Sequence, residues 1–303
     1  MQGWVALGMV LCSGTARGEQ YSPLYTLFNE FGEKSSAVYD PLREMVWTSV
    51  KDFGGVDENG SSHYLDVISH TDPNDPVCPR SLGMAFSQPS IRIHETEHML
   101  SYQISKLSGT DDYNLEGLYF QNGNGLIFSN PRTRVTDFSN MIPSELREAP
   151  SPYQTYIVEQ MKYPSLNRIG YLFNEWASYR SNILLNLQLE KAGTPESDAD
   201  GHGSNFSPHF FGYLAIGLHY LRTAEPEALK DRQFKAAFAL YAELTWQLMH
   251  EALRSPVFGK LDTIYGSRIN KLMEFYRNSP RFAAVRNSLV DIYGKEWVAK
   301  LMQ

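Results

Sequence analysis

The chain has 303 residues, 42% hydrophobic and 20% charged, which is enough for one large domain or two smaller ones and argues against a wholly disordered protein. Its 34 Asp and Glu residues outnumber its 27 Lys and Arg residues, so the net charge is −7 at pH 7. This acidic balance, with no dense run of Lys or Arg, argues against a nucleic-acid partner.

The N-terminus resembles a secretory signal peptide, although it lacks the usual Lys or Arg at its start. An apolar run extends from Trp4 to Cys12, and the small residues Gly14 and Ala16 are placed for cleavage after Ala16. The run is too short to span a membrane. We therefore predict a secreted or periplasmic protein with no stable membrane span. Cleavage would leave Cys78 as its only cysteine, which excludes an internal disulfide.

Helical and strand patterns follow one another in the first third of the chain. Asp40 and Pro41 predict the start of a helix that ends near Phe53, before two glycines. Residues 63–69 alternate between apolar and polar side chains, which predicts a strand. Residues 90–107 predict a helix, because a serine can cap its first turn and a glycine follows its last.

A β-hairpin is predicted over residues 117–130, where two apolar and aromatic runs flank the sequence Asn-Gly-Asn-Gly. An edge of such a hairpin could accept an extended peptide substrate, although a hairpin more often only completes a sheet.

The sequence becomes helical from about Tyr153 onward. Helices are predicted over residues 171–190, 209–226 and 231–255, and from Ser279 to the C-terminus, where a serine followed by a proline marks a helix start. The predicted fold class is therefore α+β and mostly helical, with a small β component before residue 135.

The predicted helix over residues 90–107 contains the sequence His-Glu-Thr-Glu-His. His94 and His98 are four positions apart, so on a helix their imidazoles lie on one face and can bind one metal ion from the same side. Glu95 can take a proton from a metal-bound water without binding the metal itself. Zinc lowers the pKa of such a water to about 7, so these residues in this order suit hydrolysis at neutral pH. A solvated helix face with incidental histidines is the alternative.

This motif resembles the active-site helix of the zincin metallopeptidases. A catalytic zinc ion has three protein ligands and an open position, so the resemblance implies a third ligand elsewhere in the chain. The metzincin form of the motif is excluded, because Ser101 and Ile104 stand where that family has glycine and histidine.

Two candidates for the third ligand stay open. Glu175 lies between Asn174 and Ser178 in a pattern similar to the second helix of the gluzincins, in which the glutamate binds zinc. Tyr179 stands where that family has an aspartate that orients a ligand histidine. Asp112 matches the first half of the aspzincin pattern but not its second half. We favour Glu175, because a ligand on a helix is more easily held in place than one on a loop.

The resemblance implies a zinc metallopeptidase that cleaves peptide bonds with metal-activated water. His94, His98 and Glu175 would bind Zn²⁺, Glu95 would be the catalytic base, and the partner would be a peptide or protein substrate. A non-catalytic binding or envelope-associated protein that retains a relic zincin helix is the alternative, and a helical domain without any metal is a second one. The oligomeric state stays open.

Residues 198–209 resemble a calcium-binding loop in part, but His209 stands at the twelfth position, where glutamate is expected. A flexible loop near the active site is therefore the preferred interpretation. His202, His209, Tyr213 and His219 lie close together in the sequence, and one of them could stabilise an oxyanion. His219 lies on an apolar helix and is better explained as a core residue.

The domain organisation predicted from these patterns has four parts. They are a signal peptide at residues 1–16, a zincin-like catalytic region at 17–190, a loop at 191–208 and a helical C-terminal region at 209–303 packed on the catalytic region.

Overall fold

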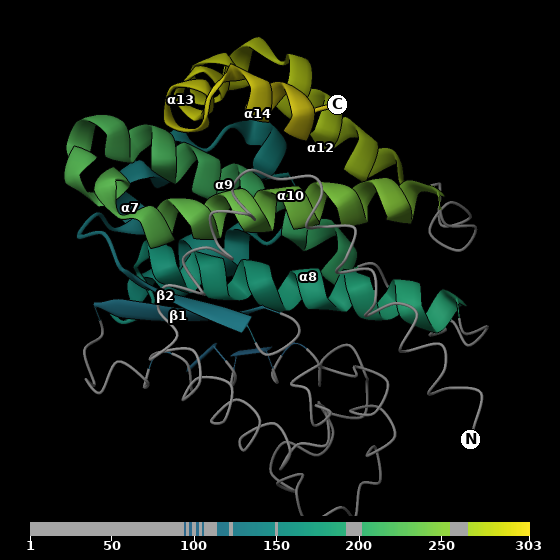
Figure 1. Ribbon diagram of the computed structural model, residues 1–303, viewed down its shortest axis with the longest axis horizontal. Helices are drawn as coiled ribbons and strands as arrows, with labels where there is room; N and C mark the ends of the chain where they lie inside the picture. The colour runs from purple at the N-terminus through teal and green to yellow at the C-terminus, as the bar shows by residue number, and fades with distance from the viewer. Residues whose placement is uncertain are drawn as a thin grey trace, which may run out of the picture. The chain divides into compact units, whose positions relative to one another are not determined.

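The structure is a computed structural model of the chain (Figure 1). It describes residues 94, 97, 98, 101, 102, 105, 114–120, 124–148, 151–191, 202–254 and 266–303. The predictions that lie outside these residues concern the signal peptide, the helix after Asp40, the strand at residues 63–69, Cys78, Glu95, Asp112 and residues 198–201 of the candidate calcium loop, whose other residues belong to a helix. The described residues are mostly helical, with one antiparallel two-stranded sheet, which confirms the coarse fold class.

The two strands are β1 (Leu115–Phe120) and β2 (Asn124–Ser129), which confirms the predicted hairpin. The described helices are α7 (Val135–Phe138), α8 (Ile169–Lys191), α9 (His202–Ala224), α10 (Arg232–Arg254), α12 (Gly266–Asn278), α13 (Ala283–Tyr293) and α14 (Lys295–Leu301). Short helical turns lie between them, among them a π-helical turn at Gln154–Glu159 and a 3₁₀ turn at Pro280–Phe282. The helical prediction for the second half of the chain is confirmed in these ranges.

The predicted loop at residues 191–208 is wrong at its C-terminal end, because α9 already starts at His202 and contains Pro208. Gly, Ser, Asn and Pro residues in this stretch favour a loop by local propensity. Tertiary packing outweighs that propensity, because Phe206 and Phe210 of α9 both contact the ring of Tyr179, with centroids 5.0 and 5.6 Å away.

The chain forms two compact units. The N-terminal unit contains Met1–Ile127 and Leu184–Ser197, and the helical unit contains Phe128–Ile183 and Asp198–Gln303. The predicted division into a catalytic region and a C-terminal region stays a prediction.

Helix α9 is the centre of the helical unit and packs against α7, α10, α12 and α13 (Figure 1). The core of the helical unit is rich in aromatic side chains. The fully buried Trp176 of α8 lies against the rings of Phe173, Phe211, Phe238 and Tyr241, with centroids 5.6 to 6.2 Å away. Aromatic rings bury large apolar areas, so this cluster holds α8, α9 and α10 together.

Gly212 allows α9 and α12 to approach closely. A Cβ atom at this position would lie 2.6 Å from the hydroxyl oxygen of Tyr276 and 2.7 Å from Cδ1 of Leu146. The Tyr276 hydroxyl is held there because it donates to the carbonyl oxygen of Pro208 at 2.7 Å. Only glycine fits between these side chains without moving them.

Two carboxylates fix the segment that follows the hairpin. Glu225 accepts hydrogen bonds from the backbone N–H of Arg132 and from the N–H and hydroxyl of Thr133, at 2.9 to 3.0 Å. Asp231 accepts from the backbone N–H of Ser129 at 3.2 Å and from that of Gln233 in the first turn of α10 at 2.8 Å. Carboxylates near a helix start satisfy N–H groups that have no partner within the helix. The two bonds of Asp231 hold the end of β2 to the start of α10.

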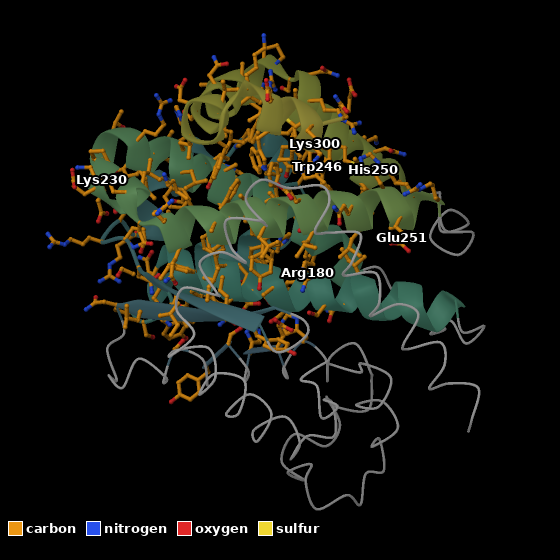
Figure 2. The ribbon with its side chains drawn as sticks, viewed as in Figure 1. Arg180, Lys230, Trp246, His250, Glu251 and Lys300 are labelled. Atoms are coloured by element: carbon orange, nitrogen blue, oxygen red, sulfur yellow. The ribbon has the colours of Figure 1, made fainter. Side chains whose placement is uncertain are left out.

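Two arginines lie against aromatic rings of α10 in the helical unit. The guanidinium carbon of Arg180, a buried residue of α8, is 5.5 Å from the centroid of the Tyr241 ring. The guanidinium carbon of Arg277 on α12 is 5.2 Å from the centroid of Trp246. Figure 2 shows Arg180 on α8 and Trp246 on α10. These cation–π contacts join α8 and α12 to α10.

Two half-buried histidines of the helical unit have lowered pKa values. Burial and then the charge of Arg222 lower the pKa of His219, and burial followed by the nearby arginine charges lowers the pKa of His250. The hydroxyl oxygen of Ser288 accepts a hydrogen bond from Arg222 at 2.7 Å and lies 2.6 Å from Nδ1 of His219. The hydroxyl hydrogen of Ser288 can then be donated to Nδ1, which suits a neutral imidazole.

We expect the free energy of unfolding to fall as the pH drops below the ordinary histidine value of 6.5. In this window the unfolded chain binds protons on both imidazoles before the folded chain does, so protonation favours unfolding. The stabilisation is complete above pH 6.5 and is lost as the pH falls through the lower folded-state pKa values. Urea denaturation from about pH 8 to about pH 5, in the presence of a chelator, measures the effect.

The matched comparison is a variant that carries His219→Gln and His250→Gln. Because glutamine does not titrate, this variant should show a shallower pH dependence than the wild-type chain. An equal slope in the two proteins would contradict the assignment.

Candidate metal centre

The two motif histidines lie on a helix, as predicted. Residues 94, 97, 98, 101, 102 and 105 are all helical. Nε2 of His94 is 3.0 Å from Nε2 of His98, the ring centroids are 4.7 Å apart, and the ring planes are inclined by 77°. Their spacing of one helical turn therefore brings the two ring nitrogens together.

The distance between these nitrogens fits two ligands of one metal ion. Two Nε2 lone pairs repel each other at 3.0 Å unless a proton or a cation lies between them. A tetrahedral zinc ion with Zn–N bonds of 2.0–2.1 Å separates its ligand nitrogens by about 3.3 Å. The observed separation needs only a few tenths of an ångström of adjustment to reach that value.

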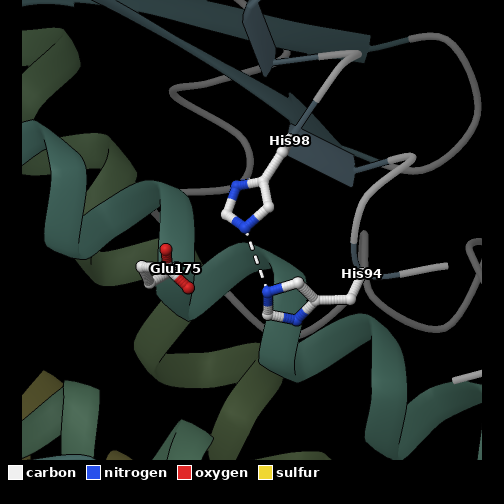
Figure 3. A group of neighbouring side chains, drawn as sticks. All are labelled: His94, His98 and Glu175. Atoms are coloured by element: carbon white, nitrogen blue, oxygen red, sulfur yellow. Dashed lines mark hydrogen bonds between the residues drawn. The ribbon is translucent and has the colours of Figure 1, made fainter. Parts of the chain in front are cut away.

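Glu175 completes the group. One ligand atom from each of His94, His98 and Glu175 lies within 4.8 Å of the other two, and Figure 3 shows the three side chains turned toward one another. Glu175 is 4% exposed and His94 is 9% exposed. Two imidazole nitrogens and one carboxylate oxygen are ligands that suit Zn²⁺, whereas calcium prefers an all-oxygen set. The structure thus brings together the three residues that the sequence predicted as ligands, and they could hold a metal ion.

Tyrosines surround the Glu175 carboxylate within the helical unit. Tyr171 and Tyr179 lie four residues before and after it, so all three share one face of α8. The Tyr171 hydroxyl donates to Oε1 of Gln160 at 2.6 Å. Burial, followed by the negative charge of Glu175, raises the pKa of both Tyr171 and Tyr156. These hydroxyls therefore stay protonated and can donate hydrogen bonds near neutral pH.

Tyr179 has a bond that the sequence did not predict. Its hydroxyl oxygen lies 2.7 Å from that of Tyr156, and the two rings meet edge to face with centroids 5.8 Å apart. Tyr156 belongs to the π-helical turn at Gln154–Glu159 and has no motif around it that could have marked it in the sequence.

Three of the other four candidates for a site role contact neighbouring residues in the described part of the chain. The buried hydroxyl of Tyr213 donates to the carbonyl oxygen of Leu146 at 2.9 Å. His219 bonds to Ser288, and His209 is buried with its ring centroid 6.3 Å from that of Tyr213. The side chain of His202 lies outside the described residues.

The chain matches no family model, no curated protein and no solved structure. Within the described ranges, no helix has both the length and the hydropathy that crossing a membrane requires.

Proposed function

We propose that the protein is a secreted or periplasmic zinc metallopeptidase that cleaves peptide or protein substrates. The observation that supports the proposal is the convergence of His94, His98 and Glu175, which come from two helices 77 residues apart in the sequence, counted as 175 − 98. A bound zinc ion supplies a Lewis acid that polarises a peptide carbonyl and lowers the pKa of water.

The chain's own residues hold the ion and move the proton. The two imidazoles and the Glu175 carboxylate bind the metal. Glu95 follows the first ligand histidine in the sequence and accepts a proton from the attacking water. It then donates that proton to the nitrogen of the leaving amine.

Metal analysis tests the proposal directly. The full chain, stripped with a chelator and then repleted with zinc, should bind about one zinc ion, because it offers three protein ligands. A variant with both His94→Ala and His98→Ala should bind none at the same protein concentration. We expect hydrolysis of a quenched fluorescent peptide library by the wild-type chain, loss of activity with chelator, and recovery with zinc.

The control is His250→Ala, which removes a histidine outside the proposed centre. This variant should keep the zinc content of the wild-type chain. A wild-type chain without zinc after repletion would overturn the proposal, and zinc binding without hydrolysis of any peptide would favour the non-catalytic alternative.

A further inference from the structure

Two serines lie on the same helix face as the histidine pair. Ser101 follows His94 by seven residues, and Ser105 follows His98 by seven residues. An α-helix turns by about 100° per residue, so seven residues turn by about 700°, which is about 20° short of two full turns. Each serine therefore lies almost directly above its histidine along the helix.

Both serines bind backbone groups of β1 within the N-terminal unit. Ser101 Oγ accepts a hydrogen bond from the N–H of Tyr119 at 3.2 Å, and Ser105 Oγ accepts one from the N–H of Gly117 at 2.7 Å. The hydroxyl of Ser105 donates in turn to the carbonyl oxygen of Ser101 at 3.1 Å. Ser101 and Tyr119 are fully buried, so water cannot replace the bond between them.

The two N–H groups belong to one edge of β1. Gly117 and Tyr119 are alternate residues of the strand, and alternate N–H groups point to the same side. An edge strand normally leaves such groups to water or to an added strand. Here the helix satisfies both of them, so an extended substrate cannot hydrogen-bond at these two positions.

Two bonds one turn apart fix the rotation of the helix about its own axis. At the outer radius of a helix, about 5–6 Å, a rotation of 20° moves a side-chain tip by about 2 Å. Metal–ligand distances tolerate only about 0.2 Å. A small rotation would therefore move both imidazoles relative to the carboxylate of Glu175, the third proposed ligand, by more than a metal centre tolerates.

We propose that Ser101 and Ser105 are positioning residues, which set the rotation of the metal-binding helix by hydrogen-bonding the edge of β1. This inference rests on the proposed metal centre. Neither serine touches the metal, so their effect must reach it through the orientation of His94 and His98.

The test measures zinc affinity and folding separately in the full chain. Zinc alone is titrated into the metal-free protein in competition with a fluorescent chelator. We expect a Ser101→Ala, Ser105→Ala variant to bind zinc about tenfold more weakly than the wild-type chain, as for other groups that orient metal ligands. Amide hydrogen exchange at Gly117 and Tyr119 should become faster in the variant, while far-ultraviolet circular dichroism stays that of a folded chain.

Three further variants make the result specific. Ser207→Ala removes another fully buried hydroxyl, one that lies 3.4 Å from the hydroxyl of Thr245, and should leave the zinc affinity unchanged. Ser105→Thr keeps the accepting oxygen and should stay close to the wild-type affinity. Ser105→Ala alone removes a half-buried hydroxyl, and it replaces the double variant in the zinc titration if the double variant does not fold.

The outcomes separate this inference from the proposed function. Zinc affinities of the serine-to-alanine variants within about twofold of Ser207→Ala would overturn the positioning role and leave the metal centre standing. A wild-type chain that binds no zinc would overturn both.

Discussion

Replacing Glu95 with glutamine is expected to lower kcat/KM for peptide hydrolysis by roughly 10²–10⁴-fold while leaving the zinc content unchanged. Glutamine has almost the same shape as glutamate, but its amide cannot accept the proton of the attacking water. The metal ligands are not altered, so the ion should still bind. Zinc analysis and steady-state kinetics on the same protein preparation measure the two quantities.

The matched control for this variant is Glu97→Gln, the same change two residues further along the same helix. Glu97 is buried on the same helix and has no proposed role in proton transfer. Its replacement therefore measures how far kcat/KM falls when a nearby carboxylate is removed. Activity of Glu95→Gln equal to that of Glu97→Gln would contradict the assignment of Glu95 as the base. Loss of zinc from Glu95→Gln would show that its effect is on metal binding instead.

Replacing Trp176 with alanine is expected to reduce the free energy of unfolding by about 3–5 kcal/mol. The indole is fully buried among four aromatic rings from three helices, so its removal loses apolar burial and leaves a cavity lined by rigid rings. Urea denaturation of the metal-free protein, followed by circular dichroism, gives the difference.

Two comparisons bound this effect. Trp176→Phe keeps an aromatic ring and should cost clearly less than alanine. Tyr163→Ala changes a side chain that is 62% exposed and should stay within about 0.5 kcal/mol of the wild-type chain. If Trp176→Ala cost no more than Tyr163→Ala, the aromatic cluster would not be the core of the helical unit.

The sequence predicted the parts of the metal centre that depend on local spacing. His94 and His98 share a helix face because four residues make about one turn, and that regularity is visible in any printed sequence. Glu175 was found only through its similarity to a known helix pattern. Its approach to a histidine 77 residues away depends on tertiary packing, which has no periodic signal.

Hydrogen bonds between distant segments were the part that the sequence did not reveal. Ser101 looks like an ordinary helix residue, and its bond to the backbone of Tyr119 involves no side chain that a pattern could mark. The pair of Tyr156 and Tyr179 hydroxyls depends on the path of a π-helical turn. Residues 202–208 misled the prediction in the opposite direction, because their polar, glycine-containing sequence favoured a loop where packing maintains a helix.

The close approach at Gly212 has an evolutionary consequence. The hydroxyl of Tyr276 and a methyl group of Leu146 occupy the space that a side chain at position 212 would need. Drift at these three positions is therefore coupled. A larger residue at 212 would require both Tyr276 and Leu146 to shift or to be replaced by smaller side chains, so the three positions should covary as a set.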